Sequence, residues 1–75
     1  MKIGIVGCAG RMGRMLVQAV VNTEGAELAG GSEMESSPFI GHDAAVVAGE
    51  APCGVNITSD ADELFANSDA VIDFT

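Results

Sequence analysis

The amino-acid sequence predicts an α/β domain built on a doubly wound parallel sheet of about four strands. Short apolar segments at 2–7, 26–31, 55–58 and 70–75 alternate with helical patterns at 11–22 and 60–66. This alternation is typical of right-handed βαβ units. Three glycines spaced three apart, Gly7, Gly10 and Gly13, join the first strand to the first helix. In the expected strand order 3-2-1-4, the carboxyl ends of the first and fourth strands meet at the ligand-binding crevice.

The glycine-rich turn after the first strand is the segment most typical of phosphate binding. Gly7 allows the sharp turn, Gly10 removes bulk where a pyrophosphate would approach the backbone, and Gly13 allows close packing of the helix on the sheet. The helix N-terminus offers unpaired N–H donors and a partial positive charge. The spacing departs from the usual G-x-G-x-x-G because Ala9 holds the middle position. The alternative is a glycine-rich turn that binds no ligand.

The helix predicted over 11–22 is amphipathic. Its apolar residues recur at helical spacing and predict one stripe facing the sheet: Met12, Met15, Leu16, Ala19 and Val20. We expect Met15 in the core, and we assign Met12 either to the core or to the lining of the turn. Arg14, Gln18 and Asn22 are expected to point to water.

The second half of the chain is expected to complete the sheet. The segment 32–54 is rich in Gly, Pro and Ser, and only Ala44–Ala48 has the pattern of a helical turn. A connection of this length is usually functional or mobile. Thr58 or Ser59 is predicted to cap the helix over 60–66. The fourth strand, 70–75, is nearly continuous in apolar character, as in a buried parallel strand, and its last residues, Phe74 and Thr75, are predicted to border the crevice.

Composition and charge exclude several classes of function. The chain has 75 residues and a net charge of −8, which argues against nucleic acid as a partner. No segment approaches the ~20 apolar residues of a membrane span. The two cysteines make neither a disulfide framework nor a metal set, and free thiols favour a cytoplasmic location. The basic residues are Lys2, Arg11 and Arg14; the two arginines start the first helix, where they either attract an anionic cofactor or are ordinary surface side chains.

The residues after the second strand bear on the choice of cofactor. Glu33 follows that strand, at a position where an acidic side chain hydrogen-bonds the adenosine ribose in NAD-binding folds. Glu35 is a rival for this role, and an ordinary solvated carboxylate is the alternative for both. Met34 cannot pair a 2′-phosphate as an arginine would.

Three further side chains have open assignments. Cys8 lies in the turn at a helix N-terminus, which can lower the pKa of a thiol, or it is simply a small side chain that the turn requires. His42 has no neighbouring ligand at suitable spacing, so no metal site is predicted. Asp73 is either buried with a partner or placed near the ligand.

The combination of motifs resembles the N-terminal signature of the dihydrodipicolinate reductase (4-hydroxy-tetrahydrodipicolinate reductase) family. The resemblance covers the whole chain and is carried by Val6–Arg14 with its Gly-Arg-Met-Gly core, by Glu33, by the segment 37–49 and by Val71–Thr75. It implies cofactor-binding residues at Gly7, Cys8, Ala9, Gly10, Arg11, Met12, Glu33, Phe74 and Thr75.

The resemblance also implies an activity. Members of this family reduce a cyclic dicarboxylate with NADH or NADPH on the route to diaminopimelate and lysine, and they are typically homotetramers built through a C-terminal domain. Many carry an arginine immediately after the glutamate; Met34 at that position favours NADH or dual use. The family's substrate-binding and proton-donating motif belongs to the second domain, so no catalytic residue is implied in this chain.

Residues 1–75 are therefore expected to form the N-terminal part of a Rossmann-like dinucleotide-binding domain, with no second domain. The cofactor domain of an aspartate or homoserine type dehydrogenase, or a non-enzymatic nucleotide-sensing module, are the alternatives. The fourth strand would be an apolar edge that pairs with other chains. We expect the isolated chain to self-associate, by edge pairing or by exchange of the fourth-strand segment between copies, and to lack reductase activity.

Overall fold

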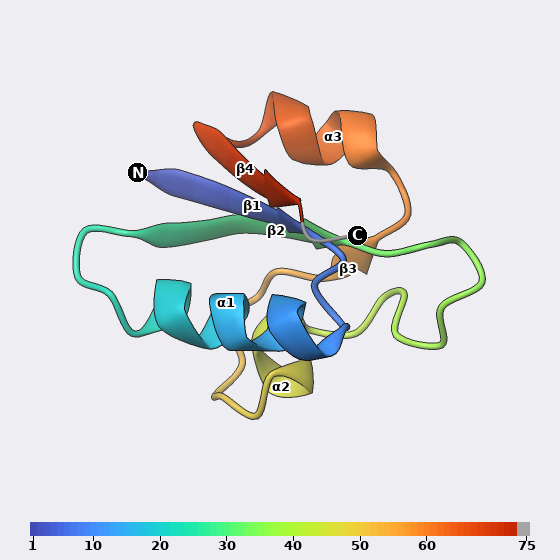
Figure 1. The fold of residues 1–75 in the computed structure, drawn as a ribbon, viewed down its shortest axis with the longest axis horizontal. Coiled ribbons are helices and arrows are strands. Elements are labelled where there is room, and N and C mark those ends of the chain that lie inside the picture. Colours follow the sequence, from blue (N-terminus) through green and yellow to red (C-terminus); the bar gives the residue numbers. More distant parts are fainter. Residues whose placement is uncertain (74–75) are drawn as a thin grey trace.

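The computed structural model describes residues 1–73 and shows one parallel sheet with helices on both faces (Figure 1). The strands are β1 (Lys2–Val6), β2 (Glu27–Ser32), β3 (Ile57–Thr58) and β4 (Ala70–Asp73), in the order β3-β2-β1-β4. The helices are α1 (Arg11–Val21), α2 (Ala44–Val47) and α3 (Ala61–Ala66). Helices α1 and α2 lie on one face of the sheet and α3 lies on the other. The predicted α/β fold and strand order are confirmed.

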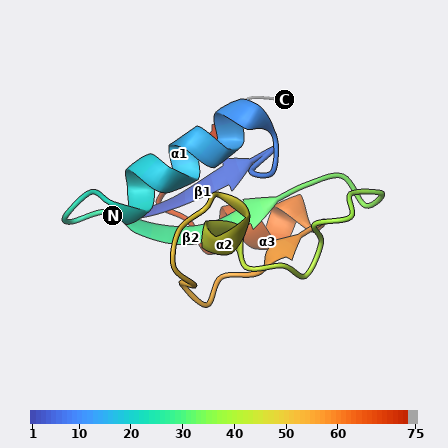
Figure 2. The same ribbon diagram turned by 90° about the horizontal axis from the view of Figure 1, so that it is seen from below.

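The long connection 32–54 covers one edge of the sheet. It follows β2, forms α2 and returns to β3, whose Ile57 N–H donates to the carbonyl of His42 at 2.8 Å. The Gly41 N–H donates to the carbonyl of Ile57, also at 2.8 Å, and Asp43 forms an antiparallel bridge with Asn56. The resulting position of α2 beside α1 is seen from below in Figure 2. This segment therefore protects the β3 edge, and the predicted helical turn at Ala44–Ala48 is confirmed as α2.

The main hydrophobic core fills the space between the sheet and the helices α1 and α2. Its buried members are Ile5, Cys8, Val17, Val20, Leu28, Ala44, Ala48 and Ile57. On the other face, Leu64 of α3 packs directly on the strand backbone. A Cβ atom built at Gly4 or Gly30 would lie 2.7 or 2.6 Å from its Cδ1 atom, so glycine in β1 and β2 allows α3 to approach.

The predicted apolar stripe of α1 is confirmed only in part: Val20 is buried and Leu16 packs half-buried against the core, but the buried face is rotated relative to the stripe. Met12 and Met15 are 47% and 58% exposed, and Ala19 is exposed as well. The buried face instead runs through Gly13, Val17 and Val20, which is about one residue, or 100°, around the helix from the predicted stripe. The physical reason is the close packing of Gly13 on the turn, which hydrophobic periodicity does not register.

Two local predictions need smaller corrections. Asp60, not Thr58 or Ser59, caps α3: its Oδ1 atom accepts a hydrogen bond from the Glu63 N–H at 3.1 Å. The Thr58 hydroxyl instead accepts from the Asp60 N–H at 3.0 Å. Among the α1 side chains expected in water, exposed Gln18 also reaches α2, because its Nε2 atom donates to the Ala48 carbonyl at 2.5 Å.

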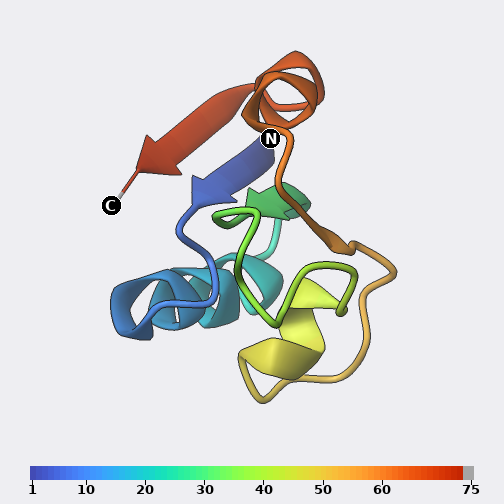
Figure 3. The same ribbon diagram turned by 90° about the vertical axis from the view of Figure 1, so that its right-hand side faces the viewer.

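The carboxyl ends of β1, β2 and β4 point to the same end of the molecule, where the glycine turn leaves the sheet (Figure 3). In register, Val6 lies between Ser32 of β2 and Asp73 of β4. Phe74 and Thr75, predicted to border the crevice here, lie outside the described residues. Their assignment therefore stays a prediction.

Candidate nucleotide-binding site

The turn after β1 is held against the end of β2 by backbone hydrogen bonds. The N–H groups of Gly7 and Cys8 both donate to the carbonyl of Ser32, at 2.8 and 3.2 Å. Gly7 has a φ of 78°, a left-handed conformation that favours glycine over other residues. The Gly10 N–H then donates to the carbonyl of Gly7 at 3.1 Å, which closes the turn. Gly7 therefore has the role predicted for it.

Gly13 brings α1 close to this turn. A Cβ atom at this position would collide with the carbonyl oxygen of Gly7 and would lie 2.7 Å from the Cα atom of Cys8. Both obstacles are backbone atoms, which cannot rotate away. Only glycine allows the helix to start here and pack at this distance, as predicted.

The N-terminus of α1 is left open. Gly10 is its N-cap, in extended conformation, and no side chain caps the helix. The N–H groups of the first turn, including those of Arg11 and Met12, have no acceptor within the helix. A Cβ atom at Gly10 would meet only the carbonyl oxygen of Gly7, at 3.4 Å, so the space above the turn is open. These N–H groups and the helix dipole together suit a phosphate group.

Glu33 lies directly beside the turn. This half-buried residue follows β2, and its Oε2 atom accepts a hydrogen bond from the Ala9 N–H at 2.8 Å. Its own N–H donates to the carbonyl of Thr58 at 2.9 Å. The structure thus brings Glu33 to the glycine turn, whereas Glu35, the rival acid, is exposed. Met34 is 74% exposed, and its uncharged side chain adds no positive charge near Glu33.

A mostly apolar cavity of about 180 Å³ opens at the carboxyl ends of the strands. It is lined by Val6, Gly7, Ser32, Glu33, Met34, Ser59 and Ala61. Sequence reasoning missed the contribution of Ser59 and Ala61, at the start of α3. The rule that ligands bind at carboxyl strand ends was the available signal, since Ser59 directly follows β3 and Ala61 lies two residues further on, at the start of α3.

Cys8 is a packing residue. Its side chain is fully buried, and burial, with a smaller contribution from the Glu33 charge, raises the pKa of the thiol to about 12. A Cβ atom at Gly31 would lie 2.7 Å from its Sγ atom, so the thiol fills the space over β2. The structure therefore favours the structural assignment of Cys8 over the reactive one.

The remaining candidates lie apart from the turn or at its rim. Arg11 and Arg14 are exposed on the first turn of α1. The His42 ring packs edge-to-face against Phe39, with centroids 5.9 Å apart. Asp73 is exposed at the end of β4. Within residues 1–73, no group of three or more His, Cys, Asp and Glu side chains is placed to hold a metal ion, and no helix is long and apolar enough to cross a membrane.

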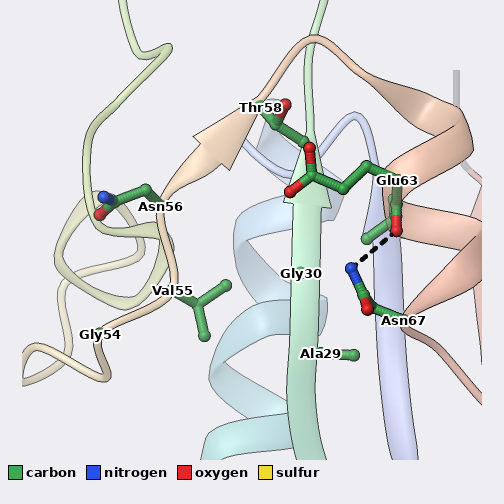
Figure 4. Close-up of a pocket in the computed structure, with 9 residues that line it drawn as sticks. Ala29, Gly30, Gly54, Val55, Asn56, Thr58, Glu63 and Asn67 are labelled. Atoms are coloured by element: carbon green, nitrogen blue, oxygen red, sulfur yellow. Dashed lines mark hydrogen bonds between the residues drawn. The ribbon is translucent and has the colours of Figure 1, made fainter.

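A larger hollow of about 290 Å³ lies on the α3 side of the sheet (Figure 4). Its lining comes from β2, from the segment 54–58 and from α3, and it includes Glu63 and Asn67. The Asn67 side chain donates to the Glu63 carbonyl at 3.0 Å. None of residues 7–13 lines this hollow, so it is separate from the candidate site.

The parallel sheet of order β3-β2-β1-β4, with a glycine-rich turn between β1 and α1, defines the class of Rossmann-like nucleotide-binding domains. The family model described as "Dihydrodipicolinate reductase, N-terminus" matches residues 1–75. The chain belongs to this family, which confirms the resemblance seen in its motifs.

Curated relatives carry the name 4-hydroxy-tetrahydrodipicolinate reductase. The chain is 49% identical to the protein of Burkholderia lata, 44% identical to that of Bartonella bacilliformis and 45% identical to that of Rhizobium meliloti, in each case over all 75 residues. It spans 28%, 28% and 31% of the length of these relatives, respectively.

Proposed function

We propose that this chain is the cofactor-binding domain of an NAD(P)H-dependent reductase acting on 4-hydroxy-tetrahydrodipicolinate, on the route to diaminopimelate and lysine. The names of the relatives support the substrate and the reaction. The observation that carries the cofactor role is the open N-terminus of α1 beside Gly10, with a carboxylate at the end of β2. The reduced nicotinamide cofactor supplies the hydride when it is bound.

The residues of the turn fit a dinucleotide. We assign the pyrophosphate to the segment Gly7–Met12, chiefly to the N–H groups of Arg11 and Met12, which lack acceptors in the helix. The free space at Gly10 admits the phosphates to the backbone. The exposed Arg11 adds positive charge to a chain whose net charge is −8, and so raises the local anion affinity.

The adenosine end of the cofactor is assigned to the neighbouring cavity. We assign the Glu33 carboxylate to accept hydrogen bonds from ribose hydroxyls, and the apolar walls of the cavity suit the edge of an adenine ring. A 2′-phosphate beside Glu33 would meet like charge, and Met34 offers no counter-charge. We therefore propose that the protein uses NADH at least as well as NADPH.

The rest of the proposal concerns the protein beyond this site. We assign no catalytic residue to this chain; the groups that bind the dicarboxylate and donate the proton are proposed to lie outside it. Phe74 and Thr75 are proposed to flank the cofactor. A homotetramer in the cytoplasm is the proposed form of the whole protein, as the family resemblance implies.

Replacing Gly10 tests the assignment of the turn. Gly10→Val places two methyl groups in the open space above the turn, while the backbone at φ −72° accepts any residue. Calorimetry on the full-length protein should show NADH affinity reduced by at least about tenfold, because the phosphates lose close approach to the backbone. Met15→Val, on the exposed side of the same helix, is the matched control and should bind normally. Equal affinities of wild type and Gly10→Val would exclude the turn as the pyrophosphate site.

A further inference from the structure

Glu33 links the end of β2 to β3 through its backbone and to the glycine turn through its side chain. Its backbone N–H donates to the carbonyl of Thr58 at 2.9 Å, which fixes the residue to β3. Its carboxylate accepts the Ala9 N–H at 2.8 Å across 24 residues of sequence. The half-buried position of Glu33 limits competition from water for this hydrogen bond. The glycine turn is therefore attached to the sheet by a side chain as well as by its backbone.

The hydrogen-bond donors of the turn fall into separate groups. Backbone carbonyls accept the N–H groups of Gly7, Cys8 and Gly10. The Ala9 N–H donates to the carboxylate. The N–H groups of Arg11 and Met12 have no acceptor in the helix. The donor occupied by Glu33 is thus distinct from the donors that a pyrophosphate would use.

We propose that Glu33 is a positioning residue for the phosphate-binding turn, in addition to any contact with ribose. This inference rests on the proposed function. Ala9 lies with Cys8 between Gly7 and Gly10, and these glycines make the backbone of the stretch intrinsically flexible. Holding its N–H fixes the path of the chain into α1 and so the direction of the two open N–H donors. A turn ordered in advance loses less conformational entropy when the cofactor binds.

The sign of the electrostatic effect separates this role from a ribose contact. A carboxylate near a pyrophosphate repels it, so removing the charge alone should strengthen the binding of an anion. Loss of the Ala9 hydrogen bond should weaken binding instead, because the turn must then be ordered by the ligand. The two roles therefore predict opposite changes for a dinucleotide whose adenosine ribose has no hydroxyls for Glu33 to bind.

The experiment uses the full-length protein and two ligands: NADH, and its analogue with a 2′,3′-dideoxy adenosine ribose. Glu33→Ala removes both the charge and the acceptor. Glu33→Gln keeps an acceptor oxygen without the charge, and Glu33→Asp keeps the charge on a side chain one methylene shorter, which we expect not to reach Ala9. Glu35→Ala, a nearby exposed acid, controls for the loss of one negative charge.

For the dideoxy analogue, we expect Glu33→Ala to bind about five- to tenfold more weakly than wild type, the scale of one lost charge-assisted hydrogen bond partly offset by relief of repulsion. Glu33→Asp keeps the repulsion and should bind at least as weakly as Glu33→Ala. Glu33→Gln and Glu35→Ala should stay within about twofold of wild type. Analogue binding by Glu33→Ala as tight as, or tighter than, that of wild type would overturn the positioning role while leaving the proposed cofactor site intact. Failure of the wild type to bind NADH at all would overturn both.

Amide hydrogen exchange of the ligand-free protein gives a readout that needs no ligand. The Ala9 N–H should exchange faster in Glu33→Asp than in wild type, while the Gly7 N–H, which donates to Ser32, should keep its rate. An unchanged Ala9 rate in Glu33→Asp would refute the hydrogen bond on which the inference depends.

Discussion

Among the described glycines, Gly13 is the one where an added Cβ atom would make the closest contact, because α1 packs directly on the turn. Gly13→Ala would gain about 1 kcal/mol from the higher helix propensity of alanine. The added Cβ atom, however, would collide with the Gly7 carbonyl oxygen and lie 2.7 Å from the Cα atom of Cys8. Relief requires movement of the helix or of the turn, because neither obstacle is a side chain.

Overpacking against rigid atoms costs about 1–3 kcal/mol and occasionally more, and the backbone obstacles here place the cost at or above the upper end. After the gain in helix propensity is subtracted from this cost, we expect Gly13→Ala to lower the free energy of unfolding by about 2 kcal/mol. For a domain of this size that is a fall in Tm of about 8–16 °C.

Gly10→Ala is the matched control, since it adds the same methyl group three residues earlier. Its Cβ atom would meet only the Gly7 carbonyl oxygen at 3.4 Å, and the backbone φ is −72°. We expect its stability to stay within about 1 kcal/mol of wild type, the scale of an N-cap change. Urea unfolding followed by circular dichroism measures both. A Gly13→Ala variant as stable as Gly10→Ala would refute the close-packing argument.

Three further predictions concern cofactor choice, thiol chemistry and assembly. Met34→Arg should strengthen NADPH binding by about 1–2 kcal/mol through a charge-assisted hydrogen bond to the 2′-phosphate; calorimetry measures this, and a wild type that prefers NADPH tenfold or more would contradict the assignment of Glu33 and Met34. Alkylation at neutral pH, followed by mass spectrometry, should modify exposed Cys53 and spare Cys8, because burial raises the pKa of the Cys8 thiol to about 12. The same shift predicts that the contribution of Cys8 to the free energy of unfolding is fully present below pH 9. It should be lost as the pH rises from 9 towards 12, because the thiol then ionises more readily in the unfolded chain. The isolated 75-residue chain should self-associate through the outer edge of β4 and show no turnover. Sedimentation that finds only monomer at several concentrations would contradict the self-association, and measurable reduction of the substrate would contradict the lack of turnover.

The sequence alone was sufficient for the order of strands and helices and for the glycine turn. Strand-turn-helix patterns are local, and Gly7 and Gly13 have roles that follow from the geometry of any such turn. The position of Glu33 after β2 was also readable, because it depends only on where that strand ends. The family resemblance came from the same short motifs.

Other features depended on the tertiary structure. The buried face of α1 was mispredicted because a glycine contact, invisible to hydrophobic periodicity, sets the rotation of the helix on the sheet. The path of 32–54 along the β3 edge depends on hydrogen bonds to Ile57 that no local pattern encodes. The hydrogen bond between Glu33 and Ala9 joins residues 24 positions apart, so it exists only because the register of β1 on β2 brings the ends of the two strands together. Local propensity specifies the elements, whereas packing between them decides which side chains meet at the site.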